Sequence, residues 1–387
     1  MEYLMLLCTC GHKTRIPVSS MGTATACASC GQRITATPLN TVPVPATAPQ
    51  TPPNPSGARS SAKRLPMLDQ LRGYAIFGMI LVNYLGHFDS MPWAFRHHKT
   101  GFSYADTIAP LFVFVVGMGF RLSLLRRIQK AGAWAARWQT ARRYLVLFVV
   151  AIAFYGPDAR IDWWDALTHI ALAGLISLPF IDKNAGVRIG AAVAYLALFM
   201  LLYMGTSYGP SFMMRSMNGG PLGPLSWAFV LLFGTLAYDL LSEGDVKKAL
   251  LWSILGGIGL VLAGWVAWYL IPKDWAGYGS HYGAFWPLSK RWCIAPAMLL
   301  STGLCFLTFA FFYYICQVRD FQFPTLTILG HNALFIYLLQ YSLMEIHGAY
   351  IPDSSGVLPA LLGFAGMYAF CYLAARKLYN EGIIIKL

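Results

Sequence analysis

The chain has 387 residues, of which 57% are hydrophobic and only 12% are charged, and its mean hydropathy is +0.53. Because a typical soluble domain carries roughly 25% charged residues, this composition excludes a soluble globule, a disordered chain, a coiled coil and a disulfide-rich secreted fold. The net charge of +13 is attributed to basic residues in the cytoplasmic loops of an integral membrane protein. No nucleic-acid partner is expected.

Two cysteine pairs, each followed by glycine, lie near the N-terminus. Cys8 and Cys10 form the first pair, and Cys27 and Cys30 form the second. Four thiolates can close a tetrahedral shell around Zn²⁺, so the pattern resembles a zinc ribbon with a structural zinc. Because the first pair is C-x-C rather than C-x-x-C, His12 is an alternative ligand. A disulfide or free thiols are the other interpretations, and a cytoplasmic position disfavours the disulfide.

The chain is expected to divide into a zinc-ribbon-like module at 1–36, a linker at 37–62 and a transmembrane domain at 63–387. Seven prolines lie between Pro38 and Pro55. Such a composition cannot bury a hydrophobic core and is typical of an extended, semi-rigid linker. Beyond the linker, long apolar runs alternate with short polar loops.

Ten apolar segments approach the ~20 residues that a helix needs to cross ~30 Å of hydrocarbon. They cover residues 70–88, 104–124, 142–156, 164–181, 187–205, 225–242, 249–271, 292–316, 325–345 and 357–375. The third is short enough to be tilted or partly re-entrant. Lipid does not satisfy unpaired backbone groups, so the predicted fold is an all-α membrane bundle of about ten helices with a small N-terminal zinc ribbon.

Lysine and arginine predict the orientation of this bundle. If the N-terminus is cytoplasmic and the ten segments alternate, 22 of the 29 basic residues face the cytoplasm and 7 face outside. The positive-inside rule then places both termini in the cytoplasm, with the chain in the cell (inner) membrane. No cleavable signal peptide is expected, because the apolar run Met1–Leu7 is short and is followed at once by cysteine and basic residues.

Polar residues recur on one face of the first apolar segment. Asp69 and Arg72 are three residues apart, so they share a helix face and can pair. Asn83 lies eleven residues after Arg72, which returns it to nearly the same face after three turns, ~16 Å further along the axis. A buried amide in a membrane is costly enough to be a functional candidate. A hydrogen bond that packs two helices is the alternative role.

The loop after this segment carries two adjacent histidines, His97 and His98, and Asp106 opens the next helix. An imidazole near a carboxylate can act as a general base whose ring the carboxylate orients. Metal binding by the two histidines is not expected, because adjacent side chains do not normally converge. A simple dipole partner at a helix start is the alternative role for Asp106. The four cysteines of the apolar segments are expected to be packing residues; they are Cys293, Cys305, Cys316 and Cys371.

The stretch from Arg64 to Leu125 resembles the start of the heparan-α-glucosaminide N-acetyltransferase catalytic domain, and similar motifs follow in the same order. These are LTHIALAGLISL from Leu167, GPLSWAFVLLFGTL from Gly223, WPLSKRWCIAPAMLLSTGL from Trp286 and LGHNALFIYLL from Leu329. The family consists of multi-pass enzymes that carry acetyl from acetyl-CoA across a membrane to a glucosamine amine.

The resemblance implies roles for two residues. Its catalytic histidine, which follows W-x-F-[KR], falls on His97, and its functional asparagine in V-N-Y falls on Asn83. The distantly similar acyltransferase-3 family has histidine where this chain has Asn83. This difference favours the heparan-α-glucosaminide N-acetyltransferase family. Two departures concern the family's W-N-G, replaced by K-T-G at 99–101 with one residue deleted, and its Q-R, replaced by T-H at 168–169. The deletion makes His98 the alternative catalytic ring.

The expected function is an acyltransferase that moves acetyl from cytoplasmic acetyl-CoA to an amine or hydroxyl of an extracytoplasmic sugar or glycan. Arg72, paired with Asp69, is the candidate for binding CoA phosphates. Asn83 would stabilise charge on the thioester carbonyl, and His97, oriented by Asp106, would deprotonate the acceptor. Transient acetylation of the histidine is a variant. A transporter or flippase for a polar solute is the main alternative function, and a structural or sensory membrane protein is the third interpretation. The sequence leaves open whether the protein forms a homo-oligomer.

Overall fold

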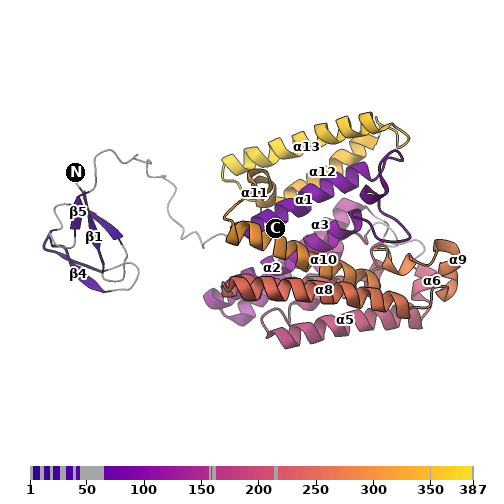
Figure 1. Ribbon diagram of the computed structural model, residues 1–387, viewed down its shortest axis with the longest axis horizontal. Coiled ribbons are helices and arrows are strands. Elements are labelled where there is room, and N and C mark those ends of the chain that lie inside the picture. The colour runs from indigo at the N-terminus through magenta and orange to yellow at the C-terminus, as the bar shows by residue number, and fades with distance from the viewer. Residues whose placement is uncertain are drawn as a thin grey trace. The chain divides into compact units, whose positions relative to one another are not determined.

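The computed structural model describes residues 3–8, 13–17, 21–26, 32–37, 41–43, 65–156, 158, 163–212, 217–348 and 350–385. The chain divides into two compact units, Met1–Arg64 and Leu65–Leu387. The first is built from short β-strands and the second from helices (Figure 1).

In the first unit, strand β1 (Tyr3–Leu7) lies between β2 (Lys13–Pro17) and β5 (Thr41–Pro43), and both neighbours pair with it in antiparallel fashion. Strands β3 (Ala24–Ala26) and β4 (Arg33–Thr35) form a separate antiparallel pair. Strand β5 lies within the segment predicted as linker, because its backbone groups find partners along β1. The sheet therefore extends beyond the predicted 1–36 module.

The predicted zinc ligands lie only partly within the described residues. Cys8 follows β1 and is buried, whereas Cys10, Cys27, Cys30 and the alternative ligand His12 lie outside them. Within the described ranges, no cluster of three or more His, Cys, Asp or Glu side chains could hold a metal ion. Zinc binding by this unit therefore stays a prediction.

The second unit is helical, and a long loop that carries His97 and His98 joins its first two helices. Its main elements are α1 (Pro66–Leu85), α2 (Ala105–Ala131), α3 (Ala133–Tyr155), α4 (Ala166–Ser177), α5 (Ala185–Gly205), α6 (Tyr208–Phe212), α7 (Gly223–Glu243), α8 (Val246–Leu270), α9 (Tyr278–Tyr282), α10 (Ala295–Tyr313), α11 (Pro324–His331), α12 (Ala333–Gly348) and α13 (Val357–Asn380). Short 3₁₀ turns at Trp93–Phe95, Gly220–Leu222, Trp275–Gly277 and Trp286–Leu288 shape the loops, and a π-helical turn, Tyr314–Val318, follows α10.

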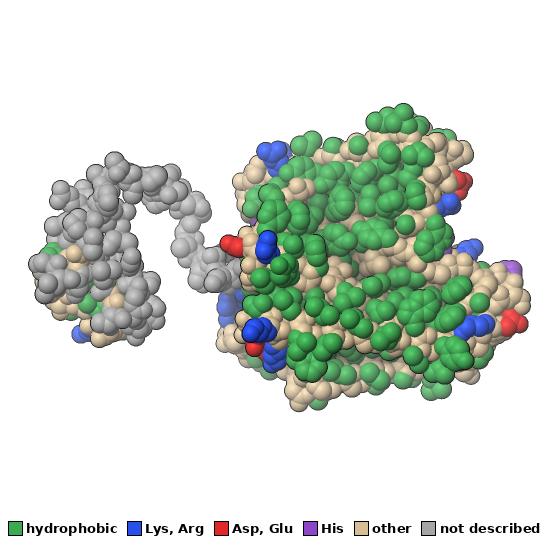
Figure 2. Space-filling model, in the orientation of Figure 1, with side chains coloured by type: hydrophobic (Ala, Val, Ile, Leu, Met, Phe, Trp, Pro, Cys, Tyr) green, Lys and Arg blue, Asp and Glu red, His purple; other side chains and the backbone are tan. Residues whose placement is uncertain are grey.

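Length and composition identify membrane-crossing helices in the described part of the chain. Six qualify, namely α2, α5, α7 with its preceding turn, α8, α10 with its π-turn, and α13, and the α11–α12 pair, bent by 86°, counts as a seventh if it forms one broken span. Hydrophobic side chains cover most of the visible face of this unit (Figure 2). The protein is therefore a multi-pass helical membrane protein, as predicted. The other three predicted segments form α1, α3 and the 12-residue α4.

Helix α3 begins at Ala133, well before the predicted start at 142. Its first turns combine arginines with two tryptophans, Trp134 and Trp138, whose exposed fractions are 84% and 62%. Arginine and tryptophan are typical of the region where lipid headgroups meet water. Because these arginines lower the local hydropathy, a search for apolar runs misses the first turns of the helix.

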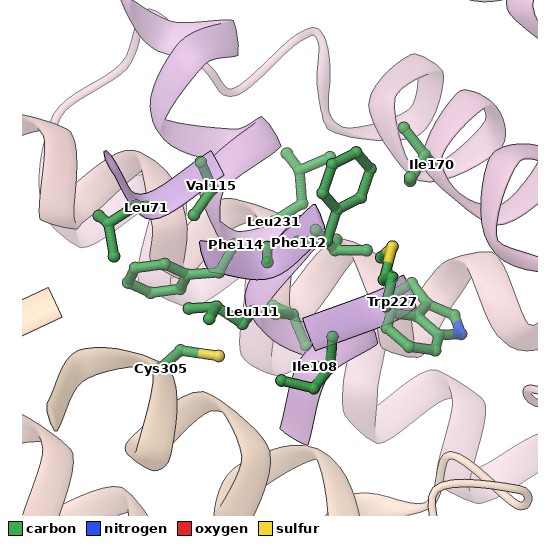
Figure 3. Packing of buried hydrophobic residues seen from close by; sticks show 14 of the residues in the cluster. Leu71, Ile108, Leu111, Phe112, Phe114, Val115, Ile170, Trp227, Leu231 and Cys305 are labelled. Atoms are coloured by element: carbon green, nitrogen blue, oxygen red, sulfur yellow. The ribbon is translucent and has the colours of Figure 1, made fainter. Parts of the chain in front are cut away.

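Helix α2 lies at the centre of the core. Figure 3 shows Phe114 of α2 packed among side chains of neighbouring helices, with Leu231 of α7 nearby. Two glycines let α2 and α7 approach closely. A Cβ on Gly117 would lie 2.0 Å from the Leu231 carbonyl oxygen, and a Cβ on Gly234 would lie 2.0 Å from the carbonyl oxygen of Phe114. Small residues at helix contacts are the usual means of packing in membranes.

Hydrogen bonds define two ends of the helical unit. At one end, Asp239 of α7 pairs with Arg121 and with the almost fully buried Arg188. We call this the basic end. The first turns of α1 also lie there, and the Asn332 amide donates to the Ile383 carbonyl of the C-terminal segment at 2.9 Å. We call the opposite end, which carries the loop between α1 and α2, the histidine end.

Candidate functional site

The predicted pair of His97 and Asp106 is formed at the histidine end. Nδ1 of His97 lies 3.0 Å from Oδ1 of Asp106. The carboxylate is buried in the first turn of α2, with 2% of its side chain exposed, whereas the imidazole is 41% exposed. Nε2 of His97 forms no hydrogen bond to any described residue. A buried carboxylate therefore holds one ring nitrogen and leaves the other nitrogen for a substrate.

Ser103 fixes the orientation of Asp106. Its backbone N–H donates to Oδ2 of Asp106 at 3.1 Å. Its hydroxyl lies between two acceptors, this same Oδ2 at 3.2 Å and the Arg96 carbonyl at 2.8 Å. Because Ser103 holds Oδ2, Oδ1 is presented to the imidazole. The geometry is that of a carboxylate that orients a ring.

The neighbouring His98 is engaged differently. Its Nε2 lies 2.8 Å from the carbonyl oxygen of Trp93, and its ring stacks on the Trp93 ring with centroids 4.7 Å apart and an interplanar angle of 12°. Its backbone carbonyl accepts a hydrogen bond from the Ser289 hydroxyl at 2.6 Å. These contacts use His98 to hold the loop, which favours His97 as the reactive ring.

The electrostatic surroundings of His97 favour its neutral form. Crowding by surrounding protein atoms lowers the pKa of His97 below its ordinary value, and the Lys290 ammonium acts in the same direction. The hydrogen bond to Asp106 opposes this change, as does the more distant carboxylate of Asp165. A neutral imidazole is the form that can accept a proton. Sequence reasoning missed both Lys290 and Asp165, which lie far away along the chain.

The segment after α9 brings Lys290 to this loop. The Trp292 indole N–H donates to the Lys99 carbonyl at 3.3 Å, and the Gly101 N–H donates to the Phe285 carbonyl at 3.1 Å. Trp292 is fully buried. These bonds fix the backbone on both sides of Lys290, whose ammonium forms no ion pair with any described carboxylate. The sequence signal was the motif WPLSKRW, which contains this lysine.

The replaced T-H dipeptide at 168–169 has a structural role. His169 is fully buried, with Nδ1 2.8 Å from the Asp165 carbonyl and Nε2 3.2 Å from the Gly220 carbonyl. The side chain of Asp165 caps α4 by accepting from the Ala166 N–H at 2.7 Å, and it also accepts from the Asn218 amide at 3.0 Å. His169 therefore joins α4 to the turn before α7 rather than facing a substrate.

The cysteines of the helical unit are buried, as predicted. Cys293 lies nearest the site, and its thiol donates to the Lys290 carbonyl at 3.0 Å. Burial raises the pKa of Cys293 to about 12. Because the thiolate is the nucleophilic form, burial makes this thiol less reactive at neutral pH.

Asn83 lies in the last turns of α1, at the same end as His97. Its side chain is half-buried and forms no hydrogen bond within the part of the chain that the structure describes. The loop that carries the histidines returns against this helix end, since a Cβ on Gly86 would lie 3.0 Å from the Phe95 carbonyl oxygen. The end of α1 that carries Asn83 and the loop that carries His97 thus lie at the same end of the unit. Among the described residues, neither the Asn83 amide nor Nε2 of His97 has a hydrogen-bond partner.

Arg72 and Asp69 form the predicted pair at the basic end. Nη1 of Arg72 lies 3.6 Å from Oδ1 of Asp69, and the arginine side chain is 33% exposed. The guanidinium reaches α2, because a Cβ on Gly119 would lie 2.4 Å from its Nη2. Tyr144, a buried phenol within electrostatic range of Arg72, is also within range of two further guanidinium groups, those of Arg127 and Arg143. Sequence reasoning named only Arg72 of these three.

Comparison with known proteins identifies a family for the part of the chain that carries these residues. The model of the family described as heparan-alpha-glucosaminide N-acetyltransferase, catalytic, matches residues 64–260. A mouse (Mus musculus) protein named heparan-alpha-glucosaminide N-acetyltransferase is 39% identical over 77 residues, which are 20% of this chain and 11% of that protein. An uncharacterized 39.9 kDa protein in the amylase 3′ region of Bacillus acidopullulyticus is 31% identical over 157 residues, 38% of this chain and 42% of that protein.

The chain thus spans less than half the length of either of these relatives. The family model, in contrast, covers just over half of this chain and includes Arg72, Asn83, His97 and Asp106. The chain therefore belongs to the heparan-alpha-glucosaminide N-acetyltransferase catalytic-domain family, a family of membrane acyltransferases.

Proposed function

We propose that this protein transfers an acetyl group from cytoplasmic acetyl-CoA to an amine or hydroxyl of an extracytoplasmic sugar or glycan. The observation that carries the proposal is the pair of His97 and Asp106, 3.0 Å apart at one end of the bundle, with three arginines gathered at the other end. Such a division suits a donor that cannot cross the membrane and an acceptor that does not enter the cytoplasm.

The basic end would hold the donor. CoA carries several phosphate charges, and guanidinium groups bind phosphates through charge-assisted hydrogen bonds. Arg72 is the principal candidate, with Asp69 fixing its position, and Arg127 and Arg143 add positive charge nearby. The pantetheine arm would extend from these arginines between the helices toward the histidine end.

The histidine end would perform the transfer. Nε2 of His97 takes the proton from the acceptor N–H or O–H as the acceptor atom attacks the thioester carbonyl carbon. The Asn83 amide donates to the oxygen on which negative charge develops. The carbon–sulfur bond then breaks, and the CoA thiolate leaves and takes the proton from the imidazolium. Asp106 stabilises the positive ring. In the two-step variant, His97 itself attacks first and passes the acetyl group on.

The proposed arrangement in the membrane has ten crossings with both termini in the cytoplasm. Gln70 near the start of α1 donates to the Phe323 carbonyl at 3.0 Å, and Asn332 donates to the Ile383 carbonyl of the C-terminal segment. These contacts lie at the same end of the bundle, which supports an even number of passes. At the opposite end, the Asp89 N–H donates to the Asp353 carbonyl at 3.0 Å. A cysteine introduced at Ser354 should therefore react with an impermeant maleimide added to intact cells; protection there would contradict this orientation.

The N-terminal unit is proposed to hold a structural zinc through Cys8, Cys10, Cys27 and Cys30. The spacing of the pairs supports this proposal, and the burial of Cys8 beside β1 is compatible with it. Four cysteine thiolates are a common ligand set for structural zinc.

The direct test uses the purified protein with acetyl-labelled acetyl-CoA and glucosamine as the probe acceptor. Labelled N-acetylglucosamine, formed by wild-type protein and not by His97→Ala, is the expected result. An O-acetylated sugar with the same dependence would assign the reaction to hydroxyls. If the protein forms no acetylated product from either class of acceptor but moves labelled glucosamine across a vesicle membrane, it is a transporter and the proposal fails.

A further inference from the structure

A groove on the membrane-facing side of the bundle has no role in the proposed reaction. It opens between α1, α10, α11 and α13 and has a cavity volume of 670 Å³, within the roughly 300–1,000 Å³ usual for ligand pockets. Its walls include Phe77, Leu307, Phe311 and Tyr368, and Phe311 is 55% exposed. None of the described residues that line it is charged.

Most of the residues that line the groove are apolar, and two of the hydroxyl groups along it are already engaged. The Tyr74 hydroxyl lies 3.3 Å from the Tyr104 hydroxyl, and the Thr308 hydroxyl donates to the Leu304 carbonyl at 2.9 Å. A polar solute would find few free donors or acceptors on these walls. A hydrocarbon chain needs none.

The groove is held open by contacts that fix α11 against α1. The Gln70 amide bonds both backbone groups of Phe323 at 3.0 Å. A Cβ on Gly73 would lie only 1.9 Å from the Leu326 carbonyl oxygen, which shows how closely the two backbones approach. Because α11 is packed so tightly on α1, its first residues form a rigid wall of the groove.

A second hollow, of 520 Å³, lies at the basic end and contains Arg319. Its other lining residues include Ile315 and Phe321. The two hollows are neighbours, because the rings of Phe321 and Phe323, one from each, meet edge to face with centroids 4.9 Å apart. Within the described residues, the exposed Arg319 side chain has neither an ion pair nor a hydrogen bond. An unengaged cation thus stands beside an apolar groove.

We propose that the groove and Arg319 together bind one anionic phospholipid, with an acyl chain against Leu307 and Phe311 and the phosphate on the guanidinium. The site is distinct from the donor and acceptor positions of the proposed function. One arginine matches the single phosphodiester of phosphatidylglycerol, whereas CoA needs several cations, such as those gathered around Arg72. The groove is also walled by α10 and α13, which are both apolar enough to span the bilayer, so lipid chains reach it directly.

The test is native mass spectrometry of the full-length protein released from nanodiscs of equal phosphatidylglycerol and phosphatidylcholine. Wild-type protein should retain one phosphatidylglycerol. Arg319→Gln should reduce its preference for phosphatidylglycerol roughly fivefold, because one basic residue near the surface is worth about 1 kcal/mol. Leu307→Trp should fill the groove and abolish retention. Phe311→Trp adds bulk at an exposed position, so it tests the same occupancy with less risk to folding.

Matched controls separate this site from ordinary lipid contact. Arg376→Gln removes an exposed charge from α13 at the same end, and Leu262→Trp adds bulk to α8 at a side chain that is 58% exposed; neither should change lipid retention. Equal retention by wild-type, Phe311→Trp and Arg319→Gln proteins would overturn the proposal. Displacement of the lipid by added acetyl-CoA would also overturn it and would assign the groove to the donor. Failure of acetyl transfer alone would leave the lipid measurement unaffected.

Discussion

His97 and Asp106 are nine residues apart in the chain, yet their side chains meet at 3.0 Å because Ser103 holds the carboxylate while the loop returns over the end of α1. The imidazole of His98, one residue further, lies against Trp93 instead. Two adjacent and chemically identical side chains therefore have different surroundings, and the proposed mechanism predicts different consequences when each is removed.

His97→Ala should strongly reduce acetyl transfer while acetyl-CoA still binds, since the proposed phosphate contacts lie at the opposite end. A general base contributes roughly 10²–10⁴-fold to a rate. His98→Ala should keep most of the activity and lose some thermal stability, because the stacking on Trp93 disappears. Transfer rates, acetyl-CoA affinity and melting temperature should be measured for both variants. Loss of activity in His98→Ala but not in His97→Ala would show that His98 is the general base and that His97 is not.

Asn83→Ala should lower turnover by ~10²–10³, the usual loss for one oxyanion donor. Its affinity for acetyl-CoA should change little, because the amide acts on the carbonyl only as charge develops. The side chain has no hydrogen bond within the described residues, so the melting temperature should stay close to that of wild-type protein. An unchanged kcat, or a loss confined to KM, would remove Asn83 from this role.

The pH dependence of transfer should report the surroundings of His97. The base must be neutral, so the rate should rise with pH through the pKa of His97, which lies below the ordinary value. Lys290→Met removes a charge that lowers this pKa and should move the rising limb to higher pH. Asp106→Asn removes an interaction that raises the pKa and should move the limb to lower pH while reducing the rate.

Lys99→Met is the matched control for this measurement, because it removes an exposed lysine of the same loop, whereas Lys290 is the lysine that lowers the pKa of His97. Its pH profile should coincide with that of wild-type protein. A Lys290→Met limb that stays in place, or moves downward, would contradict the electrostatic role of Lys290.

Arg72→Gln should raise the KM for acetyl-CoA roughly ten- to hundredfold, as expected for the loss of a hydrogen bond between charged groups. The kcat at saturating donor should fall less, because the chemistry takes place at the other end. Lys130→Gln, which removes an exposed charge from the end of α2, is the control and should change KM little. An unaltered KM in Arg72→Gln would place the donor phosphates elsewhere.

The N-terminal unit should contain about one zinc per chain, lost in the double variant Cys27→Ser plus Cys30→Ser. Zinc should be measured by elemental analysis of protein purified without chelator. Removal of residues 1–60 should leave acetyl transfer in detergent measurable, because the chain divides into two compact units near residue 64. Wild-type protein without zinc would refute the structural metal.

Much of the architecture could be predicted from the sequence, because membrane insertion depends on long apolar runs that any hydropathy reading detects. The pairing of Arg72 with Asp69 was also predictable, since residues three apart on a helix always lie on one face. The start of α3 could not be predicted in this way, because the arginines of its first turns lower the hydropathy and are interpreted as part of a loop. The short strand β5 was likewise hidden inside a segment whose prolines indicate a linker.

The surroundings of the candidate site depended on tertiary structure. Ser289 and His98 are 191 residues apart, yet they form the hydrogen bond that brings Lys290 toward His97. The choice between His97 and His98 rests on where each ring finds a partner. The groove beside Arg319 likewise exists only because α11 packs against α1. Helical periodicity fixes which residues share one helix, but contacts between distant helices follow from packing of the whole bundle, and a single sequence does not specify them locally.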